Sequence, residues 1–237
     1  MERNQLLLAI NRCPEVSRAR STPNHPCSQI VGSQQAGAFQ SPEPWRGHIE
    51  TAPILFISSN PSISGEETFP PINWTDKEVV AHYQGCFDKG VPGPYQIDAK
   101  AFNRVQFWRE VRGRATEILG RVAVQGADFA LTELVHCKSK SEYGVTEALP
   151  LCTRKWLEPV LEQSCAKVLV VLGKHAETAC SGLWSLDSSR KVHLNVQLFG
   201  SDRAIVFLPH PNARQKRNLA SQTTEREQLR LRALAVQ

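Results

Sequence analysis

The stretch "APILFISSNPS", from Ala52 to Ser62, joins an apolar run to an abrupt polar end. Residues 54–57 are all apolar, and two serines, an asparagine and a proline follow them directly. A short apolar run bounded by polar residues and prolines is typical of a buried β-strand. We therefore expect a buried strand here, and its polar end requires a structural or functional explanation.

Three further apolar runs have the same character: "ADFALTEL" at 127–134, "KVLVVLG" at 167–173 and "RAIVFLP" at 203–209. Patterns typical of helices separate or follow these runs, at 104–120, 146–164, 174–184 and 219–235. Alternating strands and helices of these lengths predict an α/β fold. We expect a single-domain, three-layer α/β/α architecture with a mostly parallel, four-stranded central sheet.

The N-terminal part of the chain does not follow this alternation. Residues 3–11 are expected to form a short helix, whereas 13–52 are rich in Pro, Ser, Arg and Gln and are expected to be loop. We therefore divide the chain into an irregular N-terminal segment, 1–52, that wraps the domain, and an α/β domain, 53–237. A short helix is also expected near 76–84. Pro150 and Pro159 argue against one unbroken helix over 146–164.

Composition limits the classes of protein that need consideration. The 237 residues carry a formal charge of +5, which permits an anionic partner without requiring one. The longest apolar run is far shorter than the roughly 20 residues that span a bilayer, and the first residues do not resemble a signal peptide. Seven cysteines, an odd number, favour a reducing compartment over a disulfide scaffold. We expect a cytoplasmic monomer with no membrane contact.

Two of the expected strands end alike, with a polar residue followed by proline. Asn60-Pro61 follows the first strand, and His210-Pro211 follows the last. In an open parallel sheet, ligands bind beyond the carboxyl ends of the strands, and proline restricts the residue before it. Asn60 and His210 are thus expected to face one crevice. Taken singly, Asn-Pro is common in simple turns and His-Pro in surface loops.

In order along the chain, these segments resemble the motifs of the uracil-DNA glycosylase superfamily. "ILFISSNPS" resembles its first motif, and "FLPHPNAR" resembles its second, a strand followed by His-Pro and a loop that enters DNA. Between them, "LTELVHCKSK" and "CAKVLVVLGKHA" are similar to the iron–sulfur branch. The resemblance covers residues 52–215. It implies a DNA glycosylase in base-excision DNA repair, which hydrolyses the N-glycosidic bond of a damaged base flipped out of DNA.

The resemblance also implies roles for individual residues. Asn60 matches the residue that positions the attacking water, and as an amide it can orient water without being a strong base. His210 matches the donor to the base as negative charge develops there. Phe69 is the candidate for stacking on the base. Residues expected at the base rim or the DNA backbone are Ser58, Ser59, Ser62, Asn212, Lys216 and Arg217. Arg214 falls near the loop tip that fills the gap left by the flipped nucleotide.

Glu133 departs from the family pattern. It stands where the family often has an asparagine that reads the uracil edge. An ionised carboxylate only accepts hydrogen bonds, whereas a buried, protonated one can imitate an amide. The excised base is therefore left open between uracil and another deaminated or modified base. Alternatively, Glu133 forms an ion pair with Lys138 or Lys140 and has no role in recognising the base.

The cysteines suggest a cofactor through the same resemblance. Cys137 and Cys152 match two ligands of the iron–sulfur branch, and Cys13 and Cys27 would complete the four thiolates of a 4Fe–4S cluster. Alternatively, these cysteines are small buried apolar side chains.

Two other functions remain open at this stage. A relative that binds damaged DNA but has weak or no turnover would fit Asn60 and Glu133. An unrelated α/β hydrolase or nucleotide-binding domain is less favoured, because the sequence has no Gly-rich phosphate loop and no Gly-x-Ser-x-Gly motif.

Overall fold

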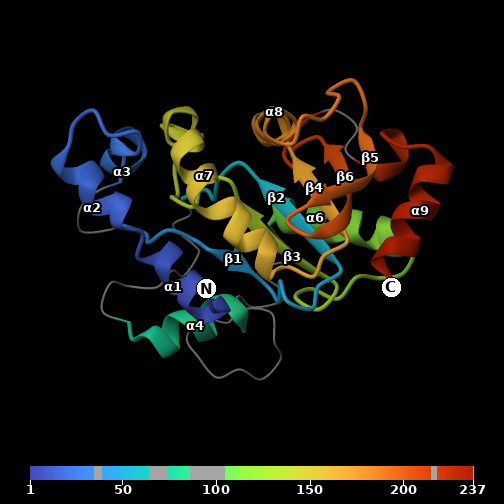
Figure 1. Ribbon diagram of the computed structural model, residues 1–237, viewed down its shortest axis with the longest axis horizontal. Coiled ribbons are helices and arrows are strands. Elements are labelled where there is room, and N and C mark those ends of the chain that lie inside the picture. Colours follow the sequence, from blue (N-terminus) through green and yellow to red (C-terminus); the bar gives the residue numbers. More distant parts are fainter. Residues whose placement is uncertain (35–38, 64–73, 86–104, 215–217, 237) are drawn as a thin grey trace.

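The computed structural model of the chain describes residues 1–34, 39–63, 74–85, 105–214 and 218–236. Its centre is a six-stranded sheet in the order β1-β3-β2-β4-β6-β5 (Figure 1). The strands are β1 (Trp45–Arg46), β2 (Ile54–Ser58), β3 (Phe129–Glu133), β4 (Val168–Leu172), β5 (Val192–Leu198) and β6 (Ser201–Leu208).

The four expected strands are β2, β3, β4 and β6, and they pair in parallel with one another. The expected total of four is wrong, because an antiparallel strand is added at each edge, β1 beside β3 and β5 beside β6. β5 has a mixed burial pattern, as an edge strand half open to solvent should, and its polar residues hide it from a search for apolar runs. β1 has only two residues.

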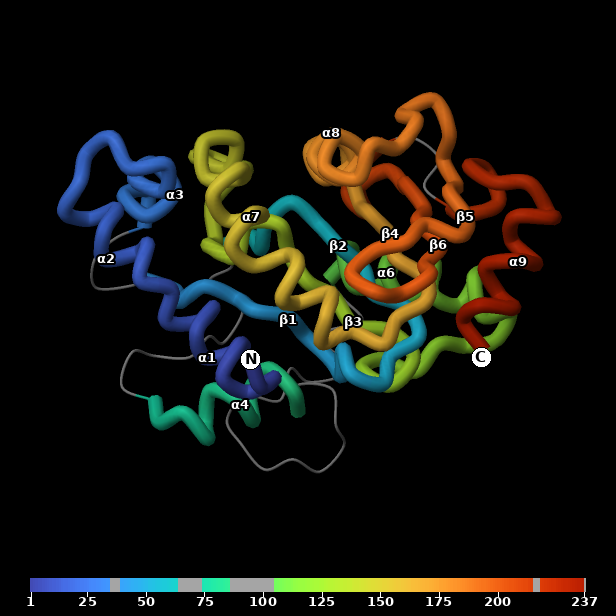
Figure 2. Tube along the Cα trace, viewed as in Figure 1, coloured from blue at the N-terminus to red at the C-terminus, as the bar shows by residue number. Residues whose placement is uncertain are grey.

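Helices cover both faces of the sheet (Figure 2). One face packs against α1 (Arg3–Asn11), α3 (Ser28–Gly32), α7 (Val145–Gln163) and α8 (Lys174–Leu183) in a single apolar cluster. The other face packs against α6 (Gln106–Leu119), α9 (Glu225–Ala235) and the short 3₁₀ helix η2 (Leu219–Ser221). The chain is therefore layered α/β/α. In the described ranges, no helix is both long and apolar enough to cross a bilayer.

The N-terminal segment is more regular than expected. Besides α1, it contains α2 (Pro14–Ser21), α3 and β1, so the loop predicted for 13–52 is wrong over these three elements. The proline at the start of α2 has the fixed backbone angle that suits the first turn of a helix. The helix expected near 76–84 is α4 (Asp76–Gln84), which begins at a capping box between Thr75 and Glu78.

Helix α7 is one continuous element despite Pro150 and Pro159. A proline inside a helix leaves the carbonyl four residues earlier without its usual partner. Here those carbonyls belong to Thr146, which is exposed, and Lys155, which is half-buried. Because solvent can reach this side, while Trp156 and Leu157 pack into the core, the two prolines are tolerated.

Candidate functional site

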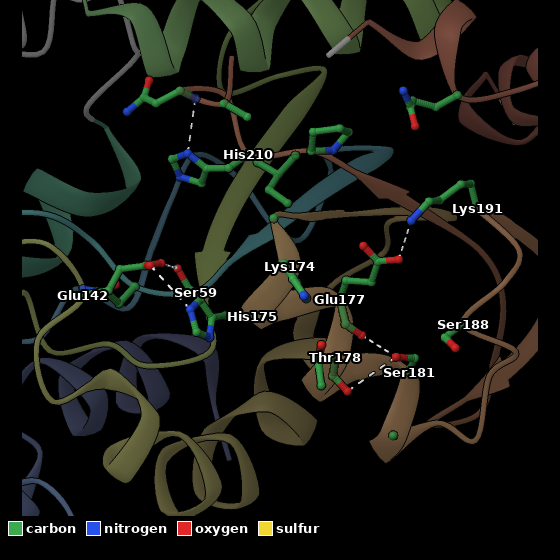
Figure 3. A pocket seen from close by; sticks show the side chains of 18 of the residues that line it. Ser59, Glu142, Lys174, His175, Glu177, Thr178, Ser181, Ser188, Lys191 and His210 are labelled. Atoms are coloured by element: carbon green, nitrogen blue, oxygen red, sulfur yellow. Dashed lines mark hydrogen bonds and ion pairs between the residues drawn. The ribbon is translucent and has the colours of Figure 1, made fainter. Parts of the chain in front are cut away.

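A cleft of about 1210 Å³ opens beyond the carboxyl ends of the parallel strands (Figure 3). The chain leaves β2 for β3 on one side and later returns to β4 on the other, so the cleft lies at the switch point of the sheet. Segments after four strands line it: Ser59, Asn60 and Ser62 after β2; Ser139, Ser141 and Glu142 after β3; Gly173, Lys174 and His175 after β4; and Pro209, His210 and Asn212 after β6.

Asn60 is held at the cleft by two hydrogen bonds from its side chain. Its Nδ2 donates to the Pro61 carbonyl at 2.9 Å and to Ser139 Oγ at 3.0 Å. Because a carbonyl only accepts, the atom that faces it must be the amide nitrogen. Asn60 Oδ1 receives no hydrogen bond from the described residues, and it is the atom that can accept one from water.

His210 begins a tight turn in which the Ala213 amide donates to the His210 carbonyl at 2.8 Å, with Pro211 at the position that proline favours. The Asn212 amide donates to His210 Nδ1 at 3.2 Å. Nδ1 therefore carries a lone pair, and the neutral ring has its proton on Nε2. Burial lowers the pKa of His210; Glu142 opposes this shift and Arg114 adds to it. The neutral ring with an Nε2–H donor is thus the favoured form.

The position of the His210 ring depends on two neighbours. The Phe107 ring packs against it with centroids 5.7 Å apart. The second neighbour is Gly173, between β4 and α8, where an added Cβ would lie 3.2 Å from the Cβ of His210. Gly173 has φ +87° and ψ 162°, a conformation essentially restricted to glycine. A glycine at this junction therefore lets the turn that carries His210 come close.

The 138–144 loop, which follows β3, forms another part of the cleft. The Ser139 amide donates to the Pro61 carbonyl, and the Ile63 amide donates to the Ser139 carbonyl, so this loop is fixed to the segment after β2. Ser141 and Glu142 have φ of +54° and +57°. The left-handed conformation costs a residue with a side chain about 1–2 kcal/mol.

The side chain of Glu142 joins two elements at the cleft. It accepts a 2.6 Å hydrogen bond from Ser59 Oγ, and its other oxygen lies 3.7 Å from His175 Nε2 on α8. In Figure 3 the three side chains lie together, and His210 extends into the same space from a different element.

The structure brings some of the sequence-predicted residues together and separates others. Ser59, Asn60, Ser62, His210 and Asn212 all line the cleft. Within the described part of the chain, Arg214 is exposed but does not line it, and neither do the buried Ser58 and Glu133. Phe69, Lys216 and Arg217 lie outside the described residues.

Glu133 is buried because it is the last residue of β3 and is paired in register with Ser58 of β2. Strand alternation places its side chain on the same face as Phe129 and Leu131, against the α6 layer. Burial raises the pKa of Glu133 well above its ordinary value, and the Glu43 carboxylate adds to this rise. Its Oε2 has no hydrogen-bond partner among the described residues. The expected partner Lys138 has its Nζ 3.1 Å from a Glu43 oxygen.

Several cleft residues were missed by the sequence analysis: Ser139, Ser141, Glu142, Lys174 and His175. The rule that identified Asn60 and His210 would also have found Lys174 and His175, which come directly after β4 and Gly173. Ser139, Ser141 and Glu142 lie six or more positions beyond the end of β3, where that rule does not reach. The strand ends were weighed only where proline followed, and no proline directly follows β3 or β4.

The four cysteines suggested as ligands line one small second cavity. Cys13 and Cys27 come from the N-terminal segment, Cys137 from the loop after β3, and Cys152 from α7. Burial raises the pKa of Cys27 to about 11 and that of Cys152 to about 12, and nearby thiols contribute to both shifts. Burial and the other three thiols also raise the pKa of Cys137. A cationic centre would reverse this by stabilising the thiolates.

Four cysteine thiols around one cavity are the donor set that iron–sulfur clusters use. In the described part of the chain, no three or more His, Cys, Asp or Glu side chains are arranged to hold a single metal ion.

The chain was compared with known proteins. A family model described as the uracil DNA glycosylase superfamily matches residues 44–234, which is most of the chain. Comparison with curated proteins finds no match. Members of this superfamily are generally glycosylase hydrolases that act on DNA.

Proposed function

We propose a function for this chain from one premise: it belongs to the uracil DNA glycosylase superfamily. The chain acts as a monofunctional DNA glycosylase that hydrolyses the N-glycosidic bond of a deaminated or otherwise modified base in base-excision repair. The observation that carries this proposal is that Asn60 and His210, 150 positions apart by their numbers, line one cleft at the carboxyl ends of parallel strands.

The chemistry follows from the two side chains. A base stacked in a duplex is out of reach, so the nucleotide must be flipped into the cleft. Breaking the bond leaves negative charge on the departing base, and the Nε2–H of His210 stabilises that charge more in the transition state than in the ground state. Asn60 Oδ1 accepts a hydrogen bond from the attacking water and orients it toward the sugar carbon.

Glu133 supports a base with a mixed donor and acceptor edge. A carboxylic acid kept neutral by burial offers one donor and one acceptor, as an amide does. Its Oε2 has no hydrogen-bond partner among the described residues, but Glu133 does not line the cleft, so this role requires the flipped base to reach beyond the residues that do. Contact between Glu133 and a base stays a prediction.

The test is release of a base from a panel of oligonucleotides. Uracil, hypoxanthine, xanthine and alkylated bases would be presented in single and double strands. We expect release of at least one of them, and we expect His210→Ala to slow it about 100-fold or more, as loss of one transition-state donor does. A matched control is His48→Ala, a half-buried histidine between β1 and β2 that does not line the cleft.

Binding of damaged or abasic DNA without release of any base would instead favour a second function, recognition without turnover. The observation that favours it is that Asn60 is an amide and cannot take a proton from water.

We also propose that Cys13, Cys27, Cys137 and Cys152 hold a 4Fe–4S cluster, as in the iron–sulfur branch. When bound, it would tie the N-terminal segment to α7 and the loop after β3. Brown protein that absorbs near 400 nm, and loses the colour in Cys152→Ser, is the expected result; colourless protein with no bound iron after anaerobic purification would contradict it. We also propose a reducing, cytoplasmic location, since no disulfide joins the six described cysteines.

A further inference from the structure

The proposed reaction lacks one chemical group. Hydrolysis needs the attacking water to lose a proton, and it builds positive charge on the sugar. Asn60 can orient the water, but an amide neither takes the proton nor carries a negative charge. A carboxylate from elsewhere in the fold could supply both properties.

Glu142 is placed to be that carboxylate. It lines the same cleft as Asn60 and His210. It accepts a hydrogen bond from Ser59, the residue directly before Asn60, at 2.6 Å. Its side chain is 46% exposed, so the carboxylate is held by the protein and still meets the water of the cleft.

The backbone around Glu142 is arranged to direct this side chain. Ser141 and Glu142 both have positive φ, and Gly144 follows with φ +75°. Residues with side chains rarely adopt this conformation, and such residues cluster at active sites. Gly144 has no room for a side chain, because an added Cβ would lie 2.4 Å from the Ile30 nitrogen. Packing against α3 therefore holds the loop in place.

We propose that Glu142 is a catalytic residue that accepts the proton of the attacking water. This inference rests on the proposed function. In the step, the bond between the sugar carbon and the base nitrogen breaks, and its electron pair leaves with the base. The water oxygen forms the new bond to the sugar carbon, and one water proton moves to Glu142. His210 stabilises the base anion, which solvent then protonates.

The charges around Glu142 are consistent with this role. His175 on α8 is the nearest cation candidate, at 3.7 Å, and Lys174 on the same helix also lines the cleft. Across the cleft, His210 after β6 is influenced electrostatically by Glu142. From the segment after β2, Ser59 contributes an uncharged donor. The Glu142 carboxylate thus lies beside the His175 ring, and its side chain stays 46% exposed to the cleft.

The test uses Glu142→Gln, which keeps an oxygen to accept from Ser59 but removes the charge and the ability to take a proton. Single-turnover release would be measured on an oligonucleotide that the wild type cleaves, beside binding of the same DNA. We expect release to slow about 100-fold or more, with DNA bound as tightly as by the wild type or more tightly. Glu158→Gln, an exposed change on α7, is the matched control and is expected to leave both unchanged.

The possible outcomes separate this proposal from the proposed function. If the wild type is active and Glu142→Gln releases the base within about threefold of the wild-type rate, Glu142 only positions Ser59 or repels DNA, and the proposal is overturned. Partial recovery of Glu142→Ala by added formate, a small carboxylate that can replace the side chain, would support it. If the wild type releases no base, the proposed function fails and this role falls with it.

Discussion

At the scale of single residues, one backbone amide decides which nitrogen of His210 carries the proton. The Asn212 N–H occupies Nδ1, so the neutral ring presents an Nε2–H donor to the cleft. Burial keeps the ring neutral by lowering its pKa. A second proton would enter at Nδ1 and would break the contact with Asn212, so acid affects both the charge of the ring and the turn that holds it.

This arrangement predicts the response of His210 to pH. We expect base release to stay constant as pH falls from 8 to about 6.5, the ordinary value for histidine, and to decline only below it. The pKa of His210 is lower in the folded protein than in the unfolded chain. The titration of His210 therefore does not change the free energy of unfolding above about pH 6.5, and it destabilises the fold as pH falls below that value. A nuclear magnetic resonance titration should give a midpoint below about 6.5, and Glu142→Gln should lower it more. A midpoint above about 6.5 in the wild type would contradict the burial argument.

The second residue-scale prediction concerns Ser139, which acts through Asn60. Its hydroxyl accepts from Asn60 Nδ2 at 3.0 Å and so fixes the amide. Ser139→Ala removes that acceptor, and one hydrogen bond of ordinary strength corresponds to about a tenfold loss of rate. The loss should appear in kcat, with KM little changed, because positioning of water is at stake. Ser17→Ala, on an exposed part of α2, is the control. A change confined to KM would assign Ser139 to DNA binding instead.

At the scale of elements, the junction of β4 and α8 sets how closely the His210 turn approaches. Gly173→Ala would place a residue with a side chain in a backbone conformation that costs about 1–3 kcal/mol. The added methyl group would also press against the His210 Cβ. We expect a loss of stability in that range and a larger loss of base release than this instability explains. Gly113→Ala, at an exposed site inside α6 with nothing near its added Cβ, should instead stabilise by about 0.5–1 kcal/mol. Equal effects in both variants, measured by denaturant unfolding, would contradict this.

The elements that could be predicted from sequence are those with uniform burial. Each central strand contains a buried apolar run, so β2, β3, β4 and β6 were found within a few residues of their bounds. β5 escaped detection because Asn195 and Gln197 interrupt it, and its turn to β6 uses Phe199-Gly200, both with positive φ, rather than a common Asn-Gly pair.

The same limit applies to the candidate site. Asn60 and His210 could be found because proline marks the strand ends that carry them. The contact of Ser59 with Glu142 joins residues 83 positions apart, and Glu142 approaches His175 of α8 from a loop in which its own φ is positive. Such contacts are decided by tertiary packing, which no local pattern of residues records.

At the scale of the whole molecule, the 138–144 loop connects the N-terminal segment, the cysteine cavity and the cleft. Lys138 lies between Cys137, which lines the cavity, and Ser139, which lines the cleft. The Lys138 ammonium group forms an ion pair with Glu43, a residue just before β1. Glu43 also forms an ion pair with Arg46. Burial alone would raise the pKa of Glu43, but the two cations outweigh it and hold the pKa well below its usual range. The N-terminal segment is thus bound through buried charge to the loop that lines the cleft.

This connection leads to the last prediction. Lys138→Met keeps a long side chain but removes one partner of a buried carboxylate, a change that typically costs about 3–5 kcal/mol. The pKa of Glu43 is lower in the folded protein than in the unfolded chain, so ionised Glu43 stabilises the fold at a pH above the unfolded pKa. This stabilisation is lost as pH falls, so the free energy of unfolding of the wild type should decrease more steeply toward acid than that of the variant. Arg12→Met, which breaks the exposed ion pair with Asp76, is the matched control and should change the free energy of unfolding much less.

High salt should screen the exposed ion pair of Arg12 and leave the effect of Lys138→Met nearly unchanged, since buried charges are poorly screened. Unfolding of Lys138→Met at the wild-type denaturant midpoint would mean that Arg46 alone satisfies Glu43, and that the loop is held by its packing and backbone hydrogen bonds rather than by charge.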